Sequence, residues 1–203
     1  KTDSYVSFVA TDNKEGGRLG ARRLGEVLGG KGKVILLRYA EGSASTMNRE
    51  EGFLEEMAAK YPNIELISTN QHAGVTKETA ITASQNLLNR FQDVNGVFCA
   101  NESSTFGMMR ALDNSGRSGT VKLVGFDTSE TLLDGMAKGA IAGLVSQDPF
   151  DIGYQGVKIA VASIRGEYVA KRIPTRLEMI TPDNVNEESI KELIHPDVDK
   201  WLN

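Results

Sequence analysis

The chain is poor in cysteine, histidine and positive charge, and each shortage argues against a class of function. Its 203 residues include one cysteine, Cys99, and two histidines, His72 and His195. A single cysteine excludes an internal disulfide, and no group of His and Cys has the spacing of a metal site. The net charge of −4 argues against a nucleic-acid-binding face, and no apolar run is long enough to cross a bilayer.

The sequence also lacks the signatures of catalysis. It has no Gly-x-Ser-x-Gly elbow, and no Gly-x-Gly-x-x-Gly fingerprint opens a helix after the first expected strand. The stretch from Gly25 to Gly32 comes close to a phosphate-binding loop. It fails because Gly32 replaces the required Ser or Thr, and because the stretch joins a helix to a strand instead of a strand to a helix. We therefore expect a protein that is not an enzyme and that uses no cofactor or metal.

What the sequence does contain is a regular alternation of short β-rich runs and helix patterns. Strands are predicted at Tyr5–Thr11, Lys33–Tyr39, Ile64–Thr69, Gly96–Ala100, Val121–Phe126 and Ala142–Ser146, with one more extended segment at Ile173–Ile180. Helices are predicted at Asn13–Leu28, Thr46–Tyr61, Thr76–Phe91, Glu102–Asn114, Ser129–Lys138, Pro149–Arg165 and Glu187–Ile194. Strict alternation predicts an α/β fold in which helices cover both faces of a doubly wound, mainly parallel sheet. Near the end, Trp201 is expected to pin the C-terminus to the body.

Polar residues follow three of the expected strands, at the point where a helix pattern begins. Asn101, Asp127 and Gln147 hold these positions. Because the carboxyl ends of the strands form the ligand crevice of an open α/β sheet, their side chains are predicted to share one pocket. Amide and carboxylate groups suit hydroxyls, which both donate and accept, so the set points to a sugar or polyol ligand. A helix cap or an Asx turn is the alternative role for Asp127 and Asn101, whereas Gln147 is a poor cap beside Asp148.

Two further residues are candidates for the same pocket. Arg49 lies near the start of a helix on its core-facing stripe, where its planar fork could hold two hydroxyls or a carboxylate. The alternative is a rim arginine paired with Glu50 or Glu51. His72 follows the third strand and could reach the crevice, and the alternative is a solvated loop histidine. Cys99, inside a strand, is expected to be a small buried hydrophobe.

Seven short segments, spread in order over nearly the whole chain, carry a resemblance to a known family. They are Thr11-Asp12-Asn13 with Gly16-Gly17, Arg49-Glu50-Glu51-Gly52-Phe53, Gln85-Asn86-Leu87-Leu88, Ala100-Asn101-Glu102, Val124-Gly125-Phe126-Asp127, Ser146-Gln147-Asp148-Pro149 and Ile180-Thr181-Pro182-Asp183-Asn184-Val185. Together they resemble the type I periplasmic sugar-binding proteins of bacterial ABC importers, the group that includes the ribose binders. One departure is the loop Gln71–Val75, which has no aromatic residue where the family often stacks one on the sugar.

The resemblance implies a receptor that captures a sugar or polyol between two lobes and closes by hinge bending. It then delivers the ligand to the membrane subunits of an ABC importer. The family positions that match Arg49, Asn101, Asp127 and Gln147 contact the sugar, and His72 joins these candidates by its position alone. The resemblance also implies a monomer in the periplasm, or a lipid-anchored protein outside a Gram-positive cell. A nucleic acid is not expected as a partner.

The resemblance also divides the chain. Family members have two similar lobes joined by three crossings, and this sequence, which has no initiating Met, is expected to lack most of the first lobe. Residues 1–148 then form the ligand-binding second lobe, residues 149–172 a helix crossing to the first lobe, and residues 173–203 a return segment and tail. Without a partner lobe, the crossing helix is expected to expose an apolar stripe that includes Ile152, Val157 and Ile164.

Two other functions share this fold. The effector domain of a lactose-repressor-like transcription regulator usually has an Arg-containing ending where this chain reads Thr181-Pro182-Asp183-Asn184-Val185, which resembles transport proteins. A sensor that presents its sugar to a membrane kinase is not separated from an importer receptor by the sequence. A helix-turn-helix encoded upstream would favour the regulator, and a signal peptide would favour the importer.

Replacing Asp127 by Ala in the complete protein is expected to weaken sugar binding by at least about tenfold, because the buried ligand hydroxyls would lose their acceptor. Isothermal titration calorimetry of the wild type and the variant measures this change. An unchanged affinity would remove Asp127 from the site.

Overall fold

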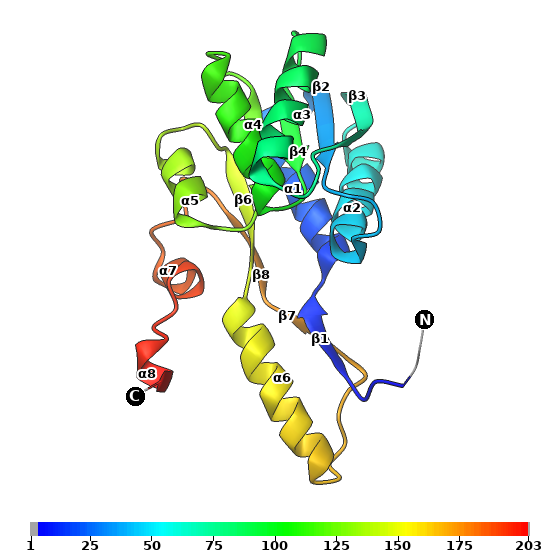
Figure 1. Cartoon of the computed structure of the whole chain (residues 1–203), viewed down its shortest axis with the longest axis vertical. Helices are drawn as coiled ribbons and strands as arrows, with labels where there is room; N and C mark the ends of the chain where they lie inside the picture. The colour runs from blue at the N-terminus through cyan, green and yellow to red at the C-terminus, as the bar shows by residue number, and fades with distance from the viewer. Residues whose placement is uncertain (1–3, 203) are drawn as a thin grey trace.

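A six-stranded sheet in the order β3-β2-β4-β5-β6-β8 forms the frame of the molecule (Figure 1). The structure, a computed structural model, describes residues 4–202 and the side chains of residues 4–200. The strands are β2 (Lys31–Arg38), β3 (Asn63–His72), β4 (Gly96–Cys99), β5 (Lys122–Phe126), β6 (Gly143–Gln147) and β8 (Leu177–Ile180). All neighbours are parallel except β8, which pairs antiparallel with β6. The predicted α/β class with a mainly parallel sheet is confirmed.

Helices cover both faces of this sheet. They are α1 (Asn13–Val27), α2 (Ala44–Lys60), α3 (Lys77–Arg90), α4 (Glu102–Asn114) and α5 (Glu130–Ala137). In β2, Val34 and Leu36 join the core formed with α1 and α2, whereas Ile35 and Leu37 join the core formed with α3, α4 and α5. Because successive side chains of a strand point to opposite faces, a strand buried on both sides reads as an unbroken apolar run.

The direction in which strands are added to the sheet reverses between β2 and β4. Helix α2 leads from β2 to β3 on one face, and α3 leads back from β3, past β2, to β4 on the other face. The connections that follow β2 and β4 therefore diverge, and this divergence predicts a crevice at the carboxyl ends of these strands. Open α/β sheets bind their ligands at such a switch point.

The first strand lies outside the main sheet, although the alternation predicts a single one. β1 (Phe8–Thr11) pairs in parallel with β7 (Arg172–Thr175) in a separate two-stranded sheet. The segment predicted as one extended run, Ile173–Ile180, is divided at Arg176 into β7 and β8. Within the described chain, three connections join the two sheets: β1 to α1, β6 to α6, and β7 to β8.

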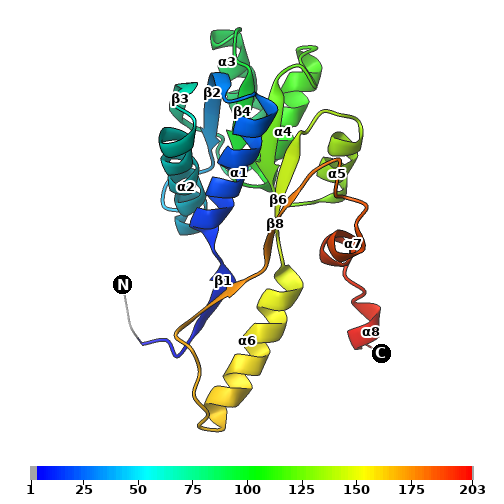
Figure 2. The same ribbon diagram turned by 180° about the vertical axis from the view of Figure 1, so that it is seen from behind.

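Helix α6 (Pro149–Ile164) projects away from the main sheet beside β1 (Figures 1 and 2). It begins as the sequence predicts, with Asp148 as N-cap and Pro149 in the first turn. None of its described residues is buried, and Val157 and Ile164 are 68% and 86% exposed. Ile152 is half-buried in a groove of about 590 Å³ between α6 and β1. The predicted apolar exposure is confirmed for Val157 and Ile164, and Ile152 is partly covered by β1.

The C-terminal segment packs on the face that α3, α4 and α5 cover. Helix α7 (Glu188–Ile194) contributes Ile190 and Leu193 to that core, and α8 (Asp199–Leu202) follows it. The side chain of Trp201 lies outside the described residues, so its role in pinning the C-terminus stays a prediction.

Two glycines let α1 and α2 touch backbone to backbone. A Cβ atom added at Gly17 would lie 1.8 Å from the carbonyl oxygen of Arg49, and one added at Gly52 would lie 2.0 Å from that of Lys14. Real Cβ atoms do not approach so closely, so any larger residue would force the helices apart. Gly17 in α1 and Gly52 in α2 therefore mark a close contact between the two helices, and that contact sets the position of Arg49.

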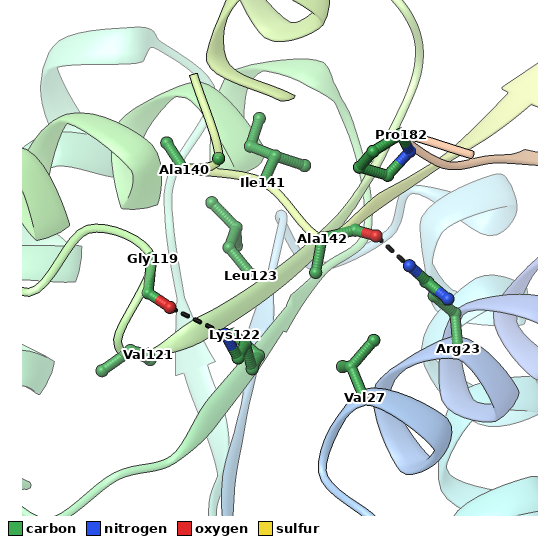
Figure 3. A pocket seen from close by; sticks show the side chains of 11 residues that line it. Arg23, Val27, Gly119, Val121, Lys122, Leu123, Ala140, Ile141, Ala142 and Pro182 are labelled. Atoms are coloured by element: carbon green, nitrogen blue, oxygen red, sulfur yellow. Dashed lines mark hydrogen bonds between the residues drawn. The ribbon is translucent and has the colours of Figure 1, made fainter. Parts of the chain in front are cut away.

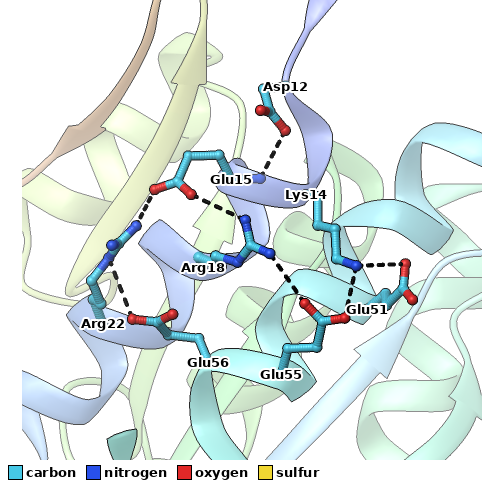
Figure 4. Close-up of polar contacts among 8 residues, drawn as sticks. All are labelled: Asp12, Lys14, Glu15, Arg18, Arg22, Glu51, Glu55 and Glu56. Carbon is cyan, nitrogen blue, oxygen red and sulfur yellow. Dashed lines mark hydrogen bonds and ion pairs between the residues drawn. The ribbon is translucent and has the colours of Figure 1, made fainter. Parts of the chain in front are cut away.

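Ion pairs line the solvent side of the same contact (Figure 4). Lys14 and Arg18 of α1 both bind Glu55 of α2, at 2.7 and 3.1 Å. These hydrogen bonds raise the pKa of Lys14 and Arg18 and lower the pKa of Glu55. Exposed pairs of this kind contribute little to stability. The glycine contact, rather than the charges, therefore fixes the separation of the two helices.

We expect Gly17→Ala to lower the free energy of unfolding by about 2 kcal/mol, because the added methyl collides with backbone atoms that cannot rotate away. Urea unfolding of the purified chain measures the change. Gly153→Ala is the matched control, since a Cβ there meets nothing within 4 Å. The control should be neutral or should stabilise by up to about 1 kcal/mol. Equal effects at both positions would contradict the packing argument.

Candidate functional site

The carboxyl ends of three neighbouring strands bring Asn101, Asp127 and Gln147 to one edge of the sheet. Asn101 comes two residues after the end of β4, Asp127 directly follows β5, and Gln147 is the last residue of β6. All three side chains are half-buried. They lie beside the switch point between β2 and β4, where the sequence places the crevice.

Asp127 and Gln147 bind each other directly. The Gln147 amide nitrogen Nε2 donates to Asp127 Oδ1 at 2.6 Å, and the other carboxylate oxygen accepts from the backbone N–H of Glu102 at 3.2 Å. Asp127 has φ of 72°, in the left-handed region that few residues other than Gly, Asn and Asp enter. An Asn substitution therefore suits this backbone better than Ala, and it tests the charge without adding strain.

Asn101 caps helix α4. Its Oδ1 accepts from the backbone N–H of Ser104 at 3.3 Å and from the Ser104 hydroxyl at 2.6 Å, and its Nδ2 donates to the Ser103 hydroxyl at 3.1 Å. The cap that the sequence left open as an alternative is therefore present. Its place at the crevice and its second amide hydrogen keep Asn101 a candidate for ligand binding.

Arg49 is buried at the centre of the candidate site, with 5% of its surface exposed. Its Nε donates to Asn13 Oδ1 at 2.8 Å and its Nη1 to the Ala100 carbonyl at 3.0 Å. The guanidinium carbon lies 3.7 Å from the centre of the Phe126 ring, a cation–π contact. Burial lowers the pKa of Arg49, and the negative charge of Asp127 opposes this effect.

Arg49 does not pair with Glu50 or Glu51, since both glutamates have other partners. Glu50 is 1% exposed and accepts from Arg38 at 3.0 Å and from the backbone N–H of Tyr39 at 3.1 Å. Burial raises the pKa of Glu50 above its usual value, and these two partners make the rise smaller. Glu51 pairs with Lys14 on the solvent side. Arg49 therefore turns toward the crevice instead of the rim.

His72 stands apart from the other candidates. It is the last residue of β3, at the outer edge of the sheet beyond β2, and its side chain is exposed. Among the described residues, no hydrogen bond or ion pair joins it to Arg49, Asn101, Asp127 or Gln147. Its part in ligand binding stays a prediction.

Two residues of the site were not selected from the sequence. Thr11 donates its hydroxyl to Gln147 Oε1 at 2.9 Å, and Asn13 accepts from Arg49. Both follow the same rule as the others, since they stand at the carboxyl end of β1. The segment Thr11-Asp12-Asn13 follows a predicted strand, so its polar residues could have been selected from the sequence. The alternation of strands and helices did not predict the separate β1–β7 sheet, which brings Thr11 close to Gln147.

A second hollow, of about 350 Å³, lies at the opposite ends of β5 and β6 (Figure 3). Its two cationic side chains are held by backbone carbonyls: Arg23 donates to Ala142 at 3.0 Å and Lys122 to Gly119 at 2.9 Å. Most of its remaining wall is apolar, and it contains none of the strand-end residues. The candidate site is therefore the crevice at the carboxyl ends.

Other chemistry finds little support in the described part of the chain. Within residues 4–200, no group of three or more His, Cys, Asp or Glu side chains could hold a metal ion. Cys99 is fully buried in β4, and burial raises the pKa of its thiol. In the same residues, no helix is both long and apolar enough to span a membrane.

Comparison with known proteins identifies the family. Residues 1–168 match the model of the periplasmic binding protein domain, and the chain belongs to this family. The ribose import binding protein of Salmonella typhimurium is 31% identical over 175 residues, which are 86% of this chain and 58% of that protein. The D-allose-binding periplasmic protein of Escherichia coli is 31% identical over 156 residues, 76% of this chain and 50% of that protein. The chain thus matches 58% and 50% of the length of these two relatives.

Solved structures agree with this assignment. A carbohydrate transporter solute-binding protein from Agrobacterium radiobacter, in complex with D-arabinose, has a TM-score of 0.90 and 31% identity over 95% of this chain and 67% of that one. An ABC transporter solute-binding protein from Agrobacterium vitis, with bound α-D-tagatopyranose, has a TM-score of 0.88 and 35% identity over 95% of this chain and 64% of that one. These relatives are binding proteins.

Proposed function

We propose that this chain is the ligand-binding lobe of a receptor that captures a sugar or polyol and delivers it to the membrane subunits of an ABC importer. The observation that carries the proposal is the gathering of a carboxylate, two amides and a buried guanidinium at the switch point. The family supports the role, since the relatives named above bind ribose, allose, arabinose and tagatose. Such a receptor works as a monomer, in the periplasm or anchored by lipid outside the cell.

The polar side chains of the candidate site bind one another or the backbone, yet they keep unused donors and acceptors for a ligand. Each oxygen of Asp127 accepts one bond within the protein, and a carboxylate oxygen has about two acceptor sites. The amides of Gln147 and Asn101 each use one of their N–H groups in the contacts described. Donors and acceptors with unused capacity are thus both available at the strand ends, as the hydroxyls of a sugar require.

We also propose the division into lobes that the resemblance implies. Residues 1–148 make up the ligand-binding lobe, residues 149–172 cross to a first lobe, and residues 173–203 return from it. The exposed apolar face of α6 and the groove beside β1 support this division, because an amphipathic helix in water needs a surface to cover. Closure would then bend the three connections between the two sheets.

The other functions have less support. Three of the relatives named are import or transporter binding proteins, which favours the importer role over a lactose-repressor-like regulator. A sensor for a membrane kinase would bind its sugar in the same crevice. It would differ only in the membrane protein that recognises the closed, ligand-bound form. The absence of a catalytic role rests on the nature of these relatives and on the missing sequence signatures.

A panel of pentoses, hexoses, polyols and amino acids tests the proposed ligand class by thermal unfolding of the complete protein. D-ribose, D-allose, D-arabinose and xylitol stand first in the panel. A bound ligand at about 100 times its dissociation constant should add about 2.7 kcal/mol of stability. We expect this shift for one or a few sugars or polyols. A response to amino acids alone, or to none of the compounds, would refute the sugar assignment.

The first lobe should cover α6 in the complete protein. Val157→Asp is then expected to lower the free energy of unfolding there by about 2 kcal/mol, because it buries a charge without a partner. Lys158→Asp, at the next position, which is also exposed, is the control and should have a smaller effect. Chemical denaturation measures both. Small and equal effects would mean that α6 stays exposed.

A further inference from the structure

Thr11 and Gln147 join two distant segments at the base of the crevice. Thr11 is the last residue of β1, in the two-stranded sheet, and Gln147 is the last residue of β6, in the main sheet. Their side chains meet at 2.9 Å although the residues stand 136 positions apart. Thr11 is 7% exposed, so its end of the bond is shielded from water. It ties together two of the connections that link the sheets.

The neighbouring carboxylate fixes the direction of this hydrogen bond. A carboxylate only accepts, so the contact with Asp127 requires Gln147 to present its NH₂ group there. The amide oxygen of Gln147 must then face Thr11, whose hydroxyl donates to it. In the reversed amide, an oxygen would face the carboxylate and two acceptors would meet. The Thr11 donor and the Asp127 acceptor thus select one of the two amide orientations.

We propose that Thr11 is a positioning residue for the ligand site, whose hydroxyl holds the Gln147 amide, and through it the Asp127 carboxylate, in the orientation that receives a ligand hydroxyl. The inference rests on the proposed function for its ligand, but the contact between Thr11 and Gln147 does not. Because Thr11 ends β1, the same hydrogen bond passes a change at Asp127 to the connection around which the two sheets would move.

Thr175 provides a matched control. It stands opposite Thr11 in the β1–β7 ladder and is equally buried, with 7% of its surface exposed. Its hydroxyl has no hydrogen-bond partner among the described residues. Thr11→Val removes a hydroxyl that donates to the site, whereas Thr175→Val makes the same change in shape and polarity one strand away and removes no bond.

The first experiment compares Thr11→Val, Thr11→Ser and Thr175→Val with the wild type in the complete protein. Calorimetry uses the sugar, among D-ribose, D-allose, D-arabinose and xylitol, that stabilises the wild type most. Thr11→Val should weaken binding about fivefold, Thr11→Ser should stay within about twofold, and Thr175→Val should bind as the wild type does. Wild-type affinity in Thr11→Val, or an equal loss in Thr175→Val, would overturn the positioning role.

A second readout needs no ligand. In the NMR spectrum of the ligand-free protein, Thr11→Val should bring the two Nε2 proton signals of Gln147 closer together and speed their exchange with water. Thr11→Ser and Thr175→Val should preserve the wild-type signals. If no sugar binds even to the wild type, the proposed function fails, and this measurement still tests Thr11. Unchanged Gln147 signals in Thr11→Val would refute the inference.

Discussion

The arrangement at the crevice depends on one buried cation, the guanidinium of Arg49. A charge withdrawn from water is tolerated only where hydrogen bonds and opposite charge replace the solvent. Arg49 obtains them from Asn13 on α1, from the carbonyl of Ala100 after β4, and from the ring of Phe126 at the end of β5. Three separate elements must therefore meet at this point. Asn101 and Asp127 directly follow Ala100 and Phe126 in the chain, so the same meeting brings both residues close to the cation.

The close contact between α1 and α2 at Gly17 also determines where Arg49 lies. Gly17 touches the carbonyl of Arg49 itself, so the distance between α1 and α2 also sets how far the guanidinium reaches over the sheet. The ion pairs around Glu55 lie on the solvent side of this contact and follow from it. A helix pair that was one methyl group wider would move the arginine away from Asn13, and the polar network would lose its central member.

Much of the fold could be predicted because its causes are local. The helix Glu102–Asn114 has the predicted bounds, since Asn101 and Ser104 form a capping box that is readable from neighbouring residues. The ends of β4, β5 and β6 could be placed for the same reason. The pairing of β1 with β7 could not, because the two strands lie at opposite ends of the chain and neither pattern specifies its partner. Thr11 was missed with it, since its role arises only when β1 reaches Gln147.

The burial of Cys99 has a practical consequence. It is the sole cysteine of the chain, it is enclosed in β4, and the raised pKa of its thiol keeps it in the unreactive protonated form. A cysteine introduced at Met47, which is 48% exposed in the first turn of α2, would stand two residues before Arg49 as the single thiol open to maleimide labelling. A fluorophore could thus be attached near the start of α2, the helix that carries Arg49, without first replacing the native cysteine.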